Sequence, residues 1–98
     1  MKEQLNPMTF YQSKVQSFCD ILNIIRTSGA TGIKTVYFRC VDWNKDADIT
    51  LWFKIVNNTK IQAYRVHNGK MVKVSEFHPD FRFTIADMFK EFEYIVER

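Results

Sequence analysis

The chain has 98 residues, of which 46% are hydrophobic and 26% charged, and its formal net charge is +3 at pH 7. This length predicts one domain with one core, and a content of only three glycines and two prolines excludes a disordered, collagen-like or low-complexity chain. No apolar run approaches the ~20 residues of a membrane-spanning helix, and the first twenty residues lack the apolar region of a secretory signal. We therefore expect a single α+β domain over residues 1–98, with residues 1–8 as a ragged terminus.

The charge is unevenly distributed along the chain. Residues 1–83 hold twelve basic and seven acidic side chains, a net charge of +5, whereas residues 84–98 hold two basic and four acidic ones, a net charge of −2. A basic body fits nucleic acid as a partner, but it also fits an acidic protein.

Cys19 and Cys40 lie among apolar residues and have no metal-like spacing. Free cysteines in such surroundings behave as small hydrophobic residues. We therefore expect two buried thiols and a cytoplasmic, reducing location, and we expect no contact with a membrane.

The first predicted element is a helix. Apolar residues recur at helical spacing from Tyr11 to Ile25, which marks one buried face. Asn6-Pro7 or Thr9 is expected to start this helix, and Gly29 is expected to follow its end.

Four strands are predicted next, because apolar and polar residues alternate along them. Asn68-Gly69 between the last two is the strongest available signal of a type I′ hairpin turn. The connections are short, so the strands form an antiparallel meander. The predicted strands cover residues 33–43, 48–56, 60–67 and 70–76.

The last predicted element is a second helix. Thr84 is its expected N-cap, with Asp87 three residues further on, and an apolar face runs from Ile85 to Val96. The expected fold is a two-layer α+β domain of order α-β-β-β-β-α, with both helices on the aliphatic side of a four-stranded antiparallel sheet.

The turn lengths also predict the strand register. They pair Phe38 with Phe53, Tyr64 with Lys73, and Ala63 with Val74. This register puts the aliphatic residues beneath the helices, and these expected core residues are Val36, Phe38, Cys40, Leu51, Phe53, Ile55, Ile61, Ala63, Val72 and Val74.

The opposite side of the predicted sheet collects aromatic rings and cations. Such a surface binds single-stranded nucleic acid, because the rings stack on bases, each worth roughly 1–3 kcal/mol, while Lys and Arg contact phosphates. We therefore expect a small non-enzymatic protein, without cofactor or metal, that binds single-stranded DNA or RNA through this face. The candidate binding residues are Tyr37, Arg39, Trp43, Trp52, Lys54, Lys60, Tyr64 and Lys73.

The same face has other interpretations. Trp, Tyr and Arg are also enriched at protein interfaces, which fits a protein-protein interaction module or inhibitor, such as a small phage or plasmid protein that acts on a host macromolecule. It also fits a homodimer joined through the sheet. If Trp52 were shielded from solvent, a structural role would be favoured instead.

The motifs associated with chemistry favour no enzyme. Residues 42–48 begin like a calcium loop, but Ala47 and Phe53 stand where that loop needs a glycine and a bidentate glutamate, so a hairpin turn is the better interpretation. His67 and His78 lack further ligands at zinc spacing. The acids of the 42–48 segment are expected to weaken phosphate binding at that end of the sheet.

Overall fold

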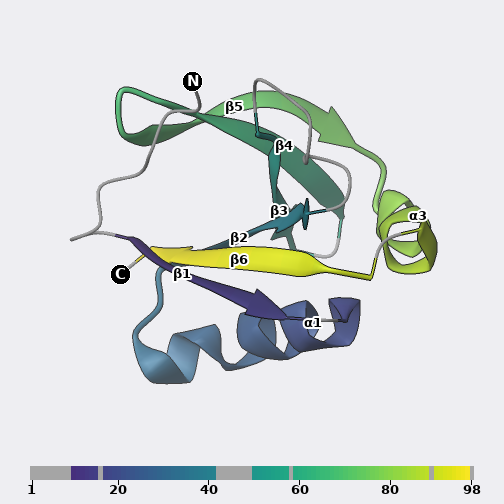
Figure 1. Cartoon of the computed structure of the whole chain (residues 1–98), viewed down its shortest axis with the longest axis horizontal. Coiled ribbons are helices and arrows are strands. Elements are labelled where there is room, and N and C mark those ends of the chain that lie inside the picture. The colour runs from purple at the N-terminus through teal and green to yellow at the C-terminus, as the bar shows by residue number, and fades with distance from the viewer. Residues whose placement is uncertain (1–9, 16, 42–49, 58, 89, 98) are drawn as a thin grey trace.

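The computed structural model describes residues 10–15, 17–41, 50–57, 59–88 and 90–97 (Figure 1). Among these residues, six strands form one antiparallel sheet in the order β1-β6-β2-β3-β4-β5. The elements are β1 (Phe10–Val15), α1 (Phe18–Thr27), the 3₁₀ turn η1 (Ser28–Thr31), β2 (Thr35–Cys40), β3 (Trp52–Val56), β4 (Lys60–His67), β5 (Lys70–Phe77), α3 (Phe81–Met88) and β6 (Phe92–Glu97).

The α+β class is confirmed, and the predicted four-stranded meander is β2-β3-β4-β5. Phe38 lies opposite Phe53, and Tyr64 lies opposite Lys73, as the turn lengths predict. Asn68 and Gly69 have φ angles of 52° and 75°, which is the backbone of a type I′ turn. Local turn chemistry therefore sets the register of this part of the sheet.

The register changes within the β4-β5 pair. An irregularity between Ala63 and Tyr64 pairs Ala63 with Ser75, so the predicted pair of Ala63 with Val74 is wrong. The expected burial of two residues is also wrong, since Val72 is 40% and Val74 is 50% exposed. A bulge of this kind inserts one residue and twists the strand locally, and it lies in a strand that has no second neighbour among the described residues.

β1 and β6 are strands, although residues 11–15 and 92–96 were expected to be helical. β6 lies between β1 and β2 and pairs antiparallel with both. Because β6 is an interior strand, Phe92 and Ile95 are each fully buried on opposite faces, and their spacing of three residues imitates a helical stripe. The segment is also rich in aromatic and β-branched residues, which favour a strand.

The first helix begins later than predicted, at Phe18. Ser17 is its N-cap, and the Oγ atom of Ser17 accepts a hydrogen bond of 3.3 Å from the backbone N–H of Asp20. This start leaves Cys19 exposed, so the expectation of two buried thiols holds only for Cys40. The left-handed residue after η1 is Gly32, with φ 75°.

The second helix begins at Phe81, four residues before Ile85, the first residue after the predicted N-cap. The backbone N–H groups of Phe81, Arg82 and Phe83 each donate a hydrogen bond to the carbonyl three residues earlier in the chain. Thr84, the predicted N-cap, therefore lies inside α3, and Phe83 is 57% exposed.

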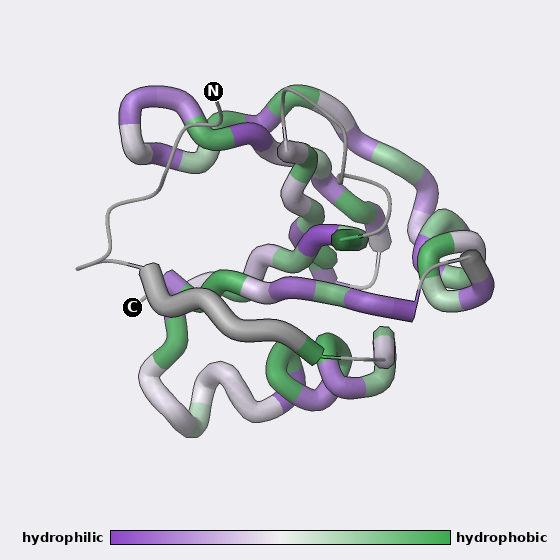
Figure 2. Tube along the Cα trace, in the orientation of Figure 1, coloured by the Kyte–Doolittle hydropathy of each residue, from purple (hydrophilic) through white to green (hydrophobic). Residues whose placement is uncertain are grey.

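Both helices pack on the same face of the sheet, which we call the helix-covered face. α1 packs against β1, β2 and β6, and α3 lies at one end of the sheet (Figure 1). Apolar residues, green in Figure 2, occur both in the helices and along the strands, and side chains from α1, α3 and the strands share one buried cluster. The buried cluster on this face comprises Phe18, Ile21, Phe38, Cys40, Phe53, Ile61, Ala63, Ile85 and Phe92. Within the described residues, no helix has the length and hydropathy needed to span a membrane.

Candidate functional site

The residues predicted to bind a ligand lie on the other side of the sheet, which we call the second face. Strand pairing aligns Glu93, Arg39, Trp52, Tyr64 and Lys73 as a row across five neighbouring strands. Directly opposed residues of antiparallel strands point to the same side. The predicted grouping of rings and cations on one face is therefore confirmed for this row.

The expected exposure of the rings is wrong. Trp52 is 5% and Tyr37 is 7% exposed, and both pack with the fully buried Ile95 of β6. The ring centroids of Tyr37 and Tyr64 are 5.2 Å apart in an edge-to-face contact, and Val66 completes one side of the cluster. The second face thus has a small core of its own, and the shielding of Trp52 favours a structural role for these rings. Neither Trp52 nor Tyr37 offers an open ring for base stacking.

Arg39 is held by partners inside the protein. Its Nη2 and Nε atoms donate to Oε2 of Glu93 at 2.7 and 3.2 Å, and its guanidinium carbon lies 5.5 Å from the ring centroid of Trp52. The side chains of Arg39 and Glu93 are only 17% and 4% exposed. This arrangement commits the guanidinium to an ion pair and a cation–π contact, which disfavours a role in phosphate binding.

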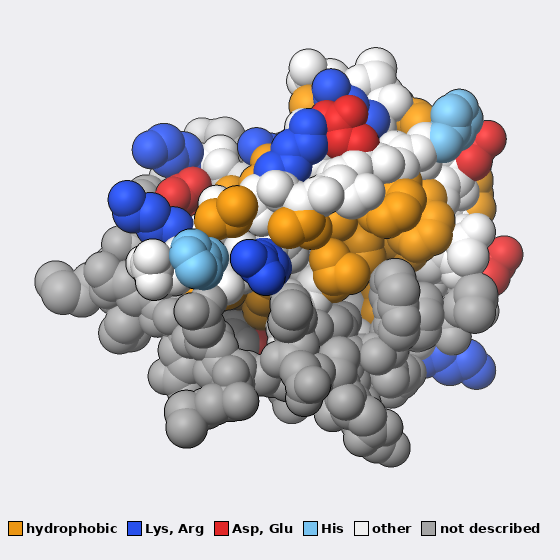
Figure 3. Space-filling view, turned by 90° about the horizontal axis from the view of Figure 1, so that it is seen from above, with side chains coloured by type: hydrophobic (Ala, Val, Ile, Leu, Met, Phe, Trp, Pro, Cys, Tyr) orange, Lys and Arg blue, Asp and Glu red, His pale blue; other side chains and the backbone are white. Residues whose placement is uncertain are grey.

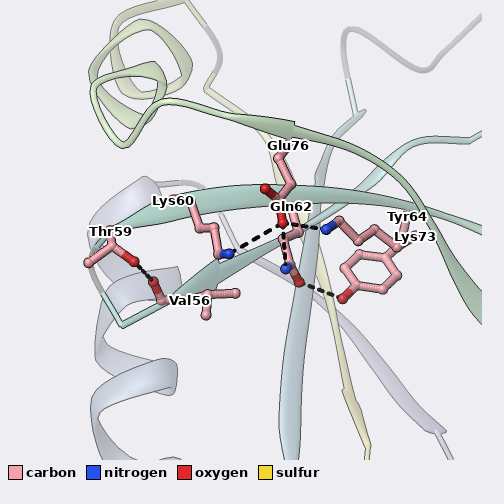
Figure 4. Close-up of polar contacts among 7 residues, drawn as sticks. All are labelled: Val56, Thr59, Lys60, Gln62, Tyr64, Lys73 and Glu76. Atoms are coloured by element: carbon pink, nitrogen blue, oxygen red, sulfur yellow. Dashed lines mark hydrogen bonds and ion pairs between the residues drawn. The ribbon is translucent and has the colours of Figure 1, made fainter.

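Lys60 and Lys73 share one counter-charge (Figure 4). The Glu76 carboxylate accepts hydrogen bonds from the Lys73 ammonium and, at 3.1 Å, from Nε2 of Gln62, and Lys60 Nζ lies 3.4 Å away. The Lys73 and Gln62 hydrogen bonds, helped by the charge of Lys60, lower the pKa of Glu76 to about 2. The Gln62 amide also accepts from the Tyr64 hydroxyl at 2.6 Å.

Tyr37 stays protonated at neutral pH. Burial, the charge of Glu97 and the neighbouring Tyr64 raise the pKa of Tyr37 to about 12. Its hydroxyl therefore contributes to packing and not to acid–base chemistry near neutrality.

Of the two remaining predicted site residues, Lys54 is described by the structure and Trp43 is not. Lys54 lies opposite Gln62 on the second face, is half-buried, and has no ion pair among the described residues. Trp43 and the calcium-like segment 42–48 lie outside the described residues.

A separation of charge between two parts of the sheet was missed by the sequence analysis. β3, β4 and β5, which we call the basic half, hold five basic residues and one acid, a net charge of +4. β1, β6 and β2, which we call the balanced half, hold two basic and two acidic residues. A local charge count would have found this feature, because residues 49–75 contain five cations and no acid.

Two cations of the basic half lie near the β4-β5 turn. Arg65 is half-buried, Lys70 is exposed, and neither forms an ion pair with a described residue. On the surface seen in Figure 3, several Lys and Arg side chains lie beside exposed hydrophobic ones. Lys70 is therefore accessible to a ligand, and the half-buried Arg65, in contrast to Arg39, has no described carboxylate as a partner.

Within the described ranges, no group of three or more His, Cys, Asp or Glu side chains could hold a metal ion. No protein-family model, curated protein or solved structure matches the chain.

Proposed function

We propose that the protein is a non-enzymatic nucleic-acid-binding protein that contacts phosphates through its basic half. The observation that carries this proposal is the net charge of +4 on β3-β5, which exceeds the net charge of +3 on the whole chain. Proteins that neutralise phosphates with Lys and Arg release counterions from the nucleic acid, and this release drives binding without sequence contacts.

In this proposal the ligand is held differently from the base stacking that the sequence predicts. Base stacking on Trp52 and Tyr37 is disfavoured by their burial, so electrostatic contacts supply the affinity. Non-specific affinities of this type lie at roughly 10⁻⁴–10⁻⁶ M at physiological salt. The binding is therefore expected to be weak and salt-sensitive.

A salt titration tests the proposal directly. Fluorescence anisotropy of a labelled oligonucleotide is measured at several salt concentrations, and the logarithm of the binding constant is expected to fall with a slope of about −2 to −4. Replacing Arg65 and Lys70 by Gln should reduce this slope by about 2. The matched control replaces Arg26 and Lys34, two exposed cations of other elements, and should leave the slope unchanged. An absence of saturable binding at low salt would refute the proposal.

A second candidate function is self-association through the outer edge of β5. This strand ends the described sheet, and it carries the exposed Val72 and Val74. An open edge with exposed apolar side chains can pair with a strand of a second copy. Sedimentation equilibrium would detect a dimer that weakens in a Val72→Thr/Val74→Thr variant, whereas a monomer at all concentrations would eliminate this candidate.

A further inference from the structure

The β4-β5 pair continues beyond the end of its neighbour. β3 pairs only with residues Lys60–Tyr64 of β4, whereas the β4-β5 ladder goes on through three more residue pairs. These pairs and the turn between them, residues 65–72, form a two-stranded segment that we call the ribbon end. The hairpin turn is visible beside the label N in Figure 1, and it is strongly hydrophilic in Figure 2.

The ribbon end is held in a defined orientation. Val66 and Met71 pack against the cluster of Tyr37, Trp52 and Ile95. Asn68-Gly69 closes the ribbon with the tight backbone already described. One side of the ribbon is thus attached to the second face, and the conformation of the turn does not depend on a ligand.

The other side of the ribbon end is basic, and three of its four side chains are exposed. Strand alternation puts Arg65, His67, Lys70 and Val72 there, with Arg65 opposite Val72 and His67 opposite Lys70. His67, Lys70 and Val72 are exposed, and no acid occurs within residues 65–72. The buried Nε atom of Arg65 has no hydrogen-bond partner among the described residues. This side offers hydrogen-bond donors and one small apolar side chain to a negatively charged partner.

We propose that the ribbon end enters the major groove of double-stranded DNA, an inference that rests on the proposed function. A two-stranded ribbon fits this groove, which is about 12 Å wide and 8.5 Å deep. Three residue pairs at about 3.4 Å per residue give a length near 10 Å, comparable to that depth.

The structure also favours this ligand over the other forms of nucleic acid. Single strands gain much of their affinity from base stacking, and the second face keeps Trp52 and Tyr37 buried. The major groove of double-stranded RNA is deep and too narrow for side chains to read. Arginine and lysine bind the acceptor edge of guanine and the phosphates of DNA, which matches the donors of Arg65 and Lys70.

The test compares three labelled probes of equal length and sequence: duplex DNA, duplex RNA and single-stranded DNA. Duplex DNA should bind about tenfold more tightly than the other two. Methyl green, which occupies the major groove, should compete with the protein, whereas netropsin, which occupies the minor groove, should not. Arg65→Gln/Lys70→Gln should reduce binding to duplex DNA to the level of the other probes, whereas Arg26→Gln/Lys34→Gln should not.

The outcomes separate the inference from the proposed function. Equal affinity for the three probes, or competition by netropsin alone, would overturn the groove assignment and leave phosphate binding by the basic half intact. No saturable binding to any probe would overturn both. Near-ultraviolet circular dichroism shows whether each variant keeps the native packing around Trp52, so that a lost affinity is not the result of unfolding.

Discussion

The balanced half and the basic half of the sheet use the same residue types in opposite ways. In the balanced half, Arg39 is bonded to Glu93 and covers Trp52, so its charge is neutralised within the protein. In the basic half, Arg65 has no acidic partner among the described residues. The comparison teaches that a cation on a sheet is a candidate for ligand binding only when no carboxylate of the protein pairs with it.

The largest expected effect tests whether Trp52 belongs to a core. Trp52→Ala should lower the free energy of unfolding by about 3–5 kcal/mol, because it removes a large buried ring and leaves a cavity. Chemical denaturation monitored by circular dichroism measures this loss. Phe83→Ala, which removes an exposed ring of α3, should change the stability by less than about 0.5 kcal/mol.

A milder substitution of Trp52 shows whether its ring only packs inside the protein or also stacks on a base of the ligand. Trp52→Phe keeps a buried ring and should bind nucleic acid as well as the unmodified protein does. A selective loss of affinity in this variant, with unchanged stability, would mean that the indole contacts the ligand.

Two arginine substitutions compare the halves of the sheet directly. Arg39→Met should cost about 3–5 kcal/mol of stability, because it leaves the buried carboxylate of Glu93 without its partner. Arg65→Met in the basic half should cost less, because no described carboxylate is left without a partner. Urea denaturation of both variants makes the comparison, and equal losses would contradict the distinction between a structural and an accessible arginine.

The two halves also differ in how far the sequence predicts them. The basic half consists of consecutive strands joined by short turns, so alternation and Asn68-Gly69 predicted its strands and most of its register. The balanced half joins β1 and β6, and pairing between residues so distant in sequence has no local signal. The burial of both faces of β6 also concealed the alternation that identifies a strand.

The unpredicted position of β6 also explains why the sequence predicted the face of the candidate site correctly but its exposure wrongly. Strand parity placed Trp52, Arg39 and Tyr64 on one face correctly, because side chains alternate along any strand. The exposure of that face depended on Ile95 and Glu93, which belong to the strand that was expected to be a helix. Without β6 in the sheet, neither the ion pair nor the second cluster could be predicted.

An alkaline titration tests the burial of Tyr37. The pKa of Tyr37 is raised to about 12 in the folded protein, whereas an unfolded tyrosine titrates near 10. The unfolded state therefore loses its proton first, and the contribution of Tyr37 to stability, complete below pH 10, is lost as the pH rises to 12. Tyr37→Phe should lose about 1–2 kcal/mol less than the unmodified protein over this range, as measured by urea denaturation at each pH. Identical pH profiles would show that the hydroxyl is accessible to water.

The smallest expected effect concerns the one acid of the basic half. Glu76→Gln removes the counter-charge that Lys60 and Lys73 share, and it should strengthen binding to duplex DNA about threefold at low salt and steepen the salt slope by up to about 1. Asp87→Asn makes the same change of charge on an exposed residue of α3, and it should change the affinity less, because Asp87 forms no ion pair with a described cation. Anisotropy titrations of both variants measure the difference.

The acid stability of Glu76→Gln gives an independent reading of the same contacts. The pKa of Glu76 is lowered from 4.5 to about 2 by the Lys73 and Gln62 hydrogen bonds, so its contribution to stability is complete above pH 4.5 and is lost as the pH falls to 2. The variant should show a shallower decrease in stability over this interval. A variant that binds DNA more tightly but keeps the acid profile of the unmodified protein would mean that Glu76 repels phosphates without holding the two lysines. The cations of β4 and β5 would then be more available to DNA than their ion pairs indicate.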